Sequence, residues 1–203
     1  MQVSVFSHFI MWNLGLSKAT TQTTVLEREC LCRYAKNQNN LIEIGVWHGV
    51  TTCCLRRSMS EDGTIFAIDP FPKGRLGFSI QMAIARTELN KVKRGTVTWW
   101  RMTGVDAAII HGASLNRKID FIFIDGDHSY DGLKGDWEGW SDSVRNGGVI
   151  ALHDSRSTHE RNIETAGSVC FTNKVVRKDV RFDLVDEVDS LTVWKRNHLE
   201  RTP

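Results

Sequence analysis

Residues 119–130 read IDFIFIDGDHSY, and this stretch decides the fold. Five of the six residues Ile119–Ile124 are apolar, and only Asp120 interrupts them. This pattern is typical of a strand that is buried on both faces inside a parallel sheet. The polar run DGDH, residues 125–128, follows the strand at once. Ligands bind at the carboxyl ends of strands in open α/β sheets, so the sequence predicts a site here.

The same pattern returns one strand later along the chain. Residues 149–152 are apolar, and they are followed by His153 and Asp154. A polar turn in which Asp127 or Ser129 caps the next helix is an alternative interpretation of the first run. It does not explain the second run. Because carboxylates and imidazoles are costly to bury for packing alone, two such runs at one sheet edge favour a functional site.

Bulk properties exclude several classes of protein. The 203 residues are 41% hydrophobic and 25% charged with a net charge of +2, which suits one globular domain and gives no strong attraction to nucleic acid. The five cysteines include no CxxC pair that would indicate zinc, and reduced thiols indicate a cytoplasmic protein. The apolar segment 3–16 lacks the features of a signal peptide and is too short to span a bilayer. No membrane partner is expected.

Apolar periodicity and turn residues predict alternating strands and helices. Such alternation predicts a parallel sheet with helices on both faces. We expect one domain over residues 24–197, a tail over residues 198–203, and a lead-in over residues 1–23 that covers the site or forms a homo-oligomer contact. The expected strands are 41–46, 64–69, 96–102, 119–124 and 149–154, followed by a hairpin of 181–188 and 191–195. The expected helices are 24–36, 51–59, 79–92, 105–111, 131–144 and one within 158–176, with a turn at residues 146–148.

The first strand leads into a glycine turn that suits a cofactor. Residues 43–52 read EIGVWHGVTT, in which Gly45 and Gly49 let the backbone approach a ligand closely. The second strand ends in Asp69, and an acid at that place commonly binds a ribose diol. Dinucleotide sites favour the pattern GxGxxG, whereas the looser ExGxxxG spacing here suits S-adenosylmethionine, which has no phosphate.

Four stretches resemble class I S-adenosylmethionine-dependent methyltransferases: LIEIGVWHGVTT, GTIFAIDPF, FIFIDGDHSYDGLKGDWEGW and GGVIALHDS. The resemblance is to the small-molecule group that includes macrolide-sugar and rhamnosyl O-methyltransferases and cephalosporin hydroxylase-like proteins, and it covers about residues 24–195. It implies a Rossmann-like, doubly wound α/β sheet of seven strands in the order 3-2-1-4-5-7-6, the last antiparallel.

The resemblance also implies roles for individual residues. Asp69 would bind the ribose, and Asp125 would contact the cofactor. Relatives often carry an acid after the glycine that follows the third strand, and Val105 departs from that pattern. The adenine would lie by Gly104 and Val105, and the methionine moiety would be held by Glu43, Gly45, Gly49 and Thr51.

Transfer of a methyl group to a hydroxyl needs alignment and removal of a proton. His128 is the candidate general base, with Asp125 and Asp154 as further catalytic candidates. Asp125, His153 and Asp154 could hold Mg²⁺ or Mn²⁺. His153 departs from the oxygen ligands that metal-dependent relatives use, and that leaves a metal-free site as the alternative. In that case Asp125 would contact only the cofactor and Asp154 would orient His128.

These observations predict a cytoplasmic S-adenosylmethionine-dependent O-methyltransferase that acts on a small polar acceptor, such as a sugar or natural product. A nicotinamide-dependent oxidoreductase is the alternative enzyme, although the glycine spacing disfavours it. A non-catalytic cofactor-binding module is the alternative outside catalysis. A nucleic-acid partner is not expected, because the basic residues are scattered.

Overall fold

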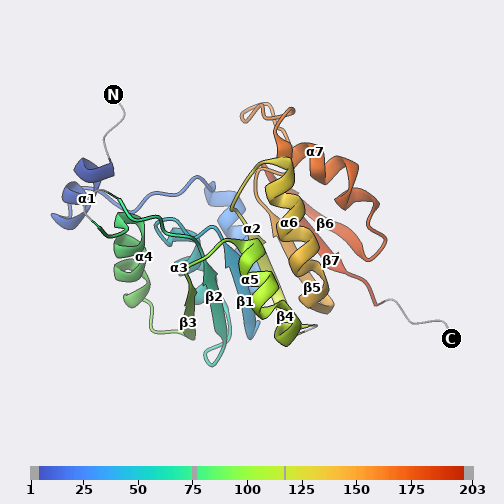
Figure 1. Ribbon diagram of the computed structural model, residues 1–203, viewed down its shortest axis with the longest axis horizontal. Helices are drawn as coiled ribbons and strands as arrows, with labels where there is room; N and C mark the ends of the chain where they lie inside the picture. Colours follow the sequence, from blue (N-terminus) through green and yellow to red (C-terminus); the bar gives the residue numbers. More distant parts are fainter. Residues whose placement is uncertain (1–4, 75–76, 117, 199–203) are drawn as a thin grey trace.

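A seven-stranded sheet forms the centre of the computed structural model, which describes residues 5–74, 77–116 and 118–198 (Figure 1). The strand order is β3-β2-β1-β4-β5-β7-β6, and β7 is antiparallel to both of its neighbours. This confirms the expected Rossmann-like order. The strands are β1 (Asn40–Ile44), β2 (Thr64–Ile68), β3 (Thr96–Trp100), β4 (Ile119–Ile124), β5 (Val144–Leu152), β6 (Phe182–Val188) and β7 (Leu191–Arg196).

The registers of the central strands bring their carboxyl ends to one level. Ile44 is paired with both Ile68 and Ile124, and Ile124 is paired with Leu152. The residues that follow these strands therefore emerge side by side at one edge. They are Gly45, Asp69, Asp125 and His153.

Alternate residues of each strand point to opposite faces, and each face is covered by helices. Figure 1 shows α5 (Gly104–His111) and α6 (Tyr130–Trp140) packed on the same face. There the even-numbered isoleucines of the central strands pack against α6 and against α7 (Gly167–Lys174). The opposite face carries α2 (Val25–Ala35), α3 (Val50–Ser58) and α4 (Ile80–Asn90). As predicted, the apolar stripe of α6 belongs to the core, with Leu133, Trp137 and Trp140 buried.

The predicted boundary between α6 and β5 was wrong. The helix ends at Trp140, a single 3₁₀ turn covers Ser141–Ser143, and Val144 already pairs with Ile119. Residues 146–148 were expected to form a turn, but they continue β5 through a register shift. Gly147 has φ +75°, a left-handed conformation that lets the strand bulge without ending.

The lead-in begins with α1 (Val5–Asn13), which packs against α4. The indole N–H of Trp12 donates a hydrogen bond of 2.8 Å to Glu88 of α4. The ring of His8 stacks on His48 at 5.3 Å, and His48 stacks on Trp47 at 4.8 Å. The lead-in thus contacts the glycine turn. Of the predicted tail, residues 199–203 lie outside the described residues.

The last two strands form the expected hairpin, with Asp189 and Ser190 at its turn. Asp189 has φ +49°, which aspartate tolerates better than most residues. Among the residues described, no helix has the length and apolar character needed to cross a bilayer.

Candidate active site

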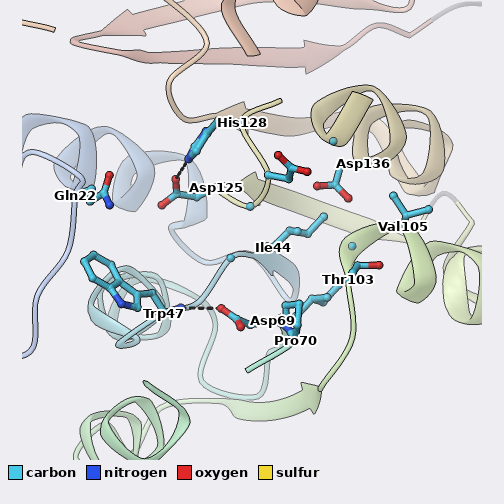
Figure 2. A pocket seen from close by; sticks show the side chains of 16 residues that line it. Gln22, Ile44, Trp47, Asp69, Pro70, Thr103, Val105, Asp125, His128 and Asp136 are labelled. Carbon is cyan, nitrogen blue, oxygen red and sulfur yellow. Dashed lines mark hydrogen bonds and ion pairs between the residues drawn. The ribbon is translucent and has the colours of Figure 1, made fainter. Parts of the chain in front are cut away.

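A cavity of about 610 Å³ opens at the carboxyl edge of the sheet, where the five parallel strands end (Figure 2). Its walls come from the loops that follow β1, β2, β3 and β4 and from the first turns of α6. Of the expected site residues it is lined by Gly45, Asp69, Gly104, Val105, Asp125 and His128.

Gly45 brings two of these loops into contact. Its φ of +89° is costly for any other residue. A Cβ atom at this position would also overlap the carbonyl oxygen of Asp125. Trp47, two residues further along the turn, has φ +47°, an unusual value for a residue with a bulky side chain. Its half-exposed ring lies on the cavity wall. The turn is therefore held in a strained shape around the cavity.

Asp69 is a structural member of the turn and also faces the cavity. Its Oδ2 accepts hydrogen bonds of 3.0 Å from the backbone N–H groups of Val46 and Trp47, and its Oδ1 accepts one of 2.7 Å from Phe71 (Figure 2). Each carboxylate oxygen has two lone pairs, so capacity for further hydrogen bonds remains.

The other predicted members of the turn lie behind it and do not line the cavity. Gly49 has φ +74° and packs closely against Ala85 and Leu89 of α4. Thr51 is buried, and its hydroxyl lies 3.3 Å from that of Thr23. Glu43 is fully buried with no hydrogen-bond partner for its carboxyl oxygens among the described residues. Burial raises the pKa of Glu43 well above its usual value, because the charged form loses its contact with water.

Asp125 and His153 form the centre of a buried charge cluster. The Nδ1 atom of His153 lies 2.8 Å from Oδ1 of Asp125, and its Nε2 atom lies 3.3 Å from Oε2 of Glu27. Burial alone would favour the neutral ring, but the neighbouring carboxylates outweigh it and raise the pKa of His153 to about 10. The ring is therefore an imidazolium cation between two carboxylates at neutral pH.

Glu27 was missed as a site residue. It is the N3 residue of the predicted capping box at the start of α2, and its Oε2 accepts the backbone N–H of Thr24. Its Oε1 accepts the N–H and the hydroxyl of Ser190. Burial opposes the charge, but the contact with His153 and these hydrogen bonds lower the pKa of Glu27 to about 2. The capping box indicated the start of the helix but not the contact with His153, which follows β5.

His128 and Asp154 are the other two predicted catalytic residues at this cluster. His128 faces the cavity with 38% of its side chain exposed, and its Nε2 lies 3.6 Å from Oδ1 of Asp125 (Figure 2). Asp154 is buried and has φ +48°. Its Oδ1 is 3.7 Å from Nδ1 of His153, and its Oδ2 pairs with Arg161. Arg161 belongs to the loop between β5 and α7, and no sequence pattern identifies it as a site residue.

Three residues of this cluster could supply ligands to a divalent metal. Asp125, His128 and His153 each offer one ligand atom, and these atoms lie within 4.8 Å of one another. Without a metal His153 is protonated, and its ring would have to release that proton before the nitrogen could bind a cation. Asp125 and Asp154 already contact cations of the chain itself, His153 and Arg161.

Asp136 is a further acid on the cavity wall that sequence reasoning did not select. It lies on α6 between the core residues Leu133 and Trp137, and only 4% of its surface is exposed. Burial, with a smaller effect of the Asp127 charge, raises the pKa of Asp136 to about 7. The sequence did contain a signal for this residue, because an acid within the apolar stripe of a helix is unusual.

Comparison with known proteins agrees with this architecture. A bound S-adenosylhomocysteine is present in an O-methyltransferase from Bacillus cereus, which is 16% identical with a TM-score of 0.61 over 97% of this chain and 92% of that one. TomG from Streptomyces achromogenes, an O-methyltransferase of tomaymycin synthesis in complex with S-adenosylmethionine, is 16% identical with a TM-score of 0.60 over 97% and 91%. A Clostridium thermocellum protein, described as a candidate rRNA methylase, is 15% identical with a TM-score of 0.58 over 87% and 100%. No curated protein sequence matches the chain.

The fold and the cavity at its carboxyl edge define a class I S-adenosylmethionine-dependent methyltransferase architecture, which confirms the resemblance. A family model described as a methyltransferase domain matches residues 42–155, more than half of the chain. The chain belongs to this methyltransferase-domain family.

Proposed function

We propose that this protein binds S-adenosylmethionine in the cavity and transfers its methyl group to a hydroxyl of a small polar acceptor, such as a sugar or natural product. Family membership supports methyl transfer. The observation that carries the proposal is the convergence of Gly45, Asp69, Asp125 and His128 on one cavity. The O-methyltransferases of similar fold, which bind this cofactor or its product, support the choice of donor and acceptor atom.

The chemistry of the cavity walls supports one orientation of the cofactor. The reactive sulfonium must lie near His128 and Asp125, and the anionic Asp125 attracts its positive charge. Asp69 is then placed to accept hydrogen bonds from the ribose hydroxyls. Gly104 and Val105 line the remaining end, where the adenine fits. Glu43, Gly49 and Thr51 act indirectly, because they hold the shape of the turn from behind.

Methyl transfer is a displacement at the sulfonium. The acceptor oxygen attacks the methyl carbon, the carbon–sulfur bond breaks, and its electron pair stays on sulfur as S-adenosylhomocysteine is released. The acceptor proton goes to His128. Because Nε2 of His128 faces Asp125, the neutral ring keeps its hydrogen there and offers the lone pair of Nδ1 to the acceptor. Asp125 then stabilises the imidazolium that forms.

His153 and Asp154 support this step without touching the acceptor. The His153 cation pairs with Asp125, and Asp154, which pairs with Arg161, lies 3.7 Å from the same ring nitrogen of His153. We therefore propose that transfer needs no divalent metal. Activity after exhaustive chelation should equal the untreated activity. A loss that Mg²⁺ or Mn²⁺ restores would assign the metal role to Asp125 and its neighbours instead.

Calorimetry and an acceptor panel test the function. Wild-type protein should bind S-adenosylhomocysteine and should not bind NADH, whereas the reverse result would favour an oxidoreductase. With a methylated acceptor in hand, His128→Ala should lower kcat roughly 10²- to 10⁴-fold. An unchanged rate in this variant would remove His128 as the base. Cofactor binding without transfer to any small molecule or RNA would favour a non-catalytic module.

A further inference from the structure

Asp136 is a mostly buried acid on the wall of the cavity. Its carboxyl forms no hydrogen bond or ion pair with any described residue, although it lies on the cavity wall. The charged group that faces it is Asp127, which repels it. A carboxyl that faces a cavity and has no hydrogen-bonding partner within the protein can take one from a bound ligand, which would explain its place.

The surrounding backbone makes room for this carboxyl. A Cβ atom on Gly104, the first residue of α5, would overlap Oδ1 of Asp136. A Cβ atom on Gly126 would lie 3.5 Å from Oδ2. Trp140, one turn further along α6, donates a hydrogen bond of 2.9 Å to the carbonyl of Gly104 and fixes the two helices together. The carboxyl is therefore held in place against the α5 backbone.

Figure 2 shows Asp136 near Val105 and Ile44, apart from His128. Ile44, Pro70 and Val105 line the cavity and suit a flat apolar ring. In S-adenosylmethionine the ribose separates the sulfonium from the adenine. With the sulfonium at His128 and the ribose at Asp69, the purine reaches the end where Asp136 stands.

We propose that Asp136 recognises the adenine of the cofactor by accepting a hydrogen bond from its exocyclic 6-amino group. This inference rests on the function proposed above and adds to it the residue that selects the adenine base. Adenine places a ring nitrogen acceptor beside that amino donor. A neutral carboxyl can therefore also donate to the ring nitrogen, whereas the carboxylate only accepts from the amine.

The test compares two ligands by calorimetry on the full-length protein. The first is S-adenosylhomocysteine, and the second is its 6-deamino analogue, in which hydrogen replaces the exocyclic amine. Wild-type protein should bind the analogue about 10- to 100-fold more weakly, the range for one hydrogen bond to a charged or strongly polar group. Asp136→Leu should bind both ligands with equal affinity.

Two further variants complete the design. Asp136→Ala serves if leucine beside Gly104 blocks the cavity, and it should likewise show no preference. Asp131→Asn, an exposed acid at the start of the same helix, should keep the full wild-type preference. Thermal unfolding without ligand checks that every variant is folded.

Each outcome decides a different point. A wild-type protein that binds both ligands equally, or an Asp136→Ala variant that keeps the preference, would overturn the role of Asp136 and leave the proposed function intact. A wild-type protein that binds neither ligand would overturn the proposed function itself.

Discussion

At the scale of single residues, Gly45 decides how closely the turn after β1 approaches the Asp125 loop. We predict that Gly45→Ala weakens or abolishes binding of S-adenosylhomocysteine. The new methyl group must push the Asp125 carbonyl away, and the positive φ adds about 1–3 kcal/mol of strain. Calorimetry measures the affinity, and chemical denaturation measures the loss in the free energy of unfolding.

A second glycine provides the matched control for this change. Gly112 has a helical φ of −55°, and a Cβ atom there would meet its nearest neighbour at an ordinary 3.6 Å. Gly112→Ala should leave the affinity unchanged and should not destabilise the fold. Equal behaviour of the two variants would contradict the close approach at Gly45.

Asp136 should make stability depend on pH in the ligand-free protein. Its folded pKa of about 7 exceeds the ordinary value of 3.8, so between these values the folded protein keeps a proton that the unfolded chain has lost. Stability therefore falls as pH rises across this window. Above pH 7, Asp136→Asn should be more stable than wild type by at most roughly 4 kcal/mol, at about 1.4 kcal/mol per pKa unit.

Below pH 4 the difference between these two proteins should vanish, because the carboxyl is then neutral in both states. Urea titrations at pH 4, 6 and 8 measure it. A difference that stays constant over this range would mean that Asp136 is ionised throughout.

Residues next to a strand end could be found from the sequence, whereas their distant partners could not. Asp125 and His128 follow β4 directly, so the end of the apolar run marks them. Glu27 and Arg161 reach the same cluster from α2 and from the loop after β5. Such contacts depend on how helices and loops pack, and no local pattern of the sequence encodes that packing.

At the scale of elements, Glu27 joins α2 to two other segments. Its carboxylate contacts His153 after β5, caps its own helix and binds the turn between β6 and β7. Removing one partner of a buried ion pair costs about 3–5 kcal/mol when the other charge stays. We predict that Glu27→Ala loses about this much in the free energy of unfolding at pH 7.

This loss should shrink in acid. The folded pKa of Glu27 is lowered to about 2 from 4.5, so its contribution is present above pH 4.5 and disappears as pH falls through 2. Denaturation curves of the two proteins should converge there. Glu29, an exposed neighbour on the same helix, gives the control, since Glu29→Ala should change stability little at any pH.

The elements themselves were largely predictable because their signals are local. Apolar runs marked the parallel strands, and the Thr24 capping box marked the start of α2. The border between α6 and β5 was not predictable in the same way. Val144 continues the helical spacing of Trp137 and Trp140, and the glycines after it usually end a strand. Pairing with β4 overrides both local preferences there.

At the scale of the whole molecule, cofactor product should stabilise the fold. A ligand that binds only the folded state adds about 2.7 kcal/mol at one hundred times its Kd. For a chain of this length each kcal/mol raises Tm by roughly 2–4 °C. We predict a rise of about 5–11 °C with S-adenosylhomocysteine at that excess, measured by calorimetric or fluorescence melting.

Asp69→Ala provides the comparison for this rise. The variant loses the carboxylate that faces the ribose, so its melting temperature should respond far less to the same ligand concentration. An equal rise in both proteins would place the ligand outside this cavity.

Through the stacked rings of His8, His48 and Trp47, α1 supports the cavity wall at Trp47. Thr20 also contacts the ring of His48 at 2.8 Å, and Gln22 stands on the cavity wall itself. A shortened chain that starts at residue 24 would keep the whole sheet and yet lose every one of these supports. Removal of these N-terminal residues for crystallisation would thus change the shape of the cavity opening. A purification tag is better placed at the C-terminus.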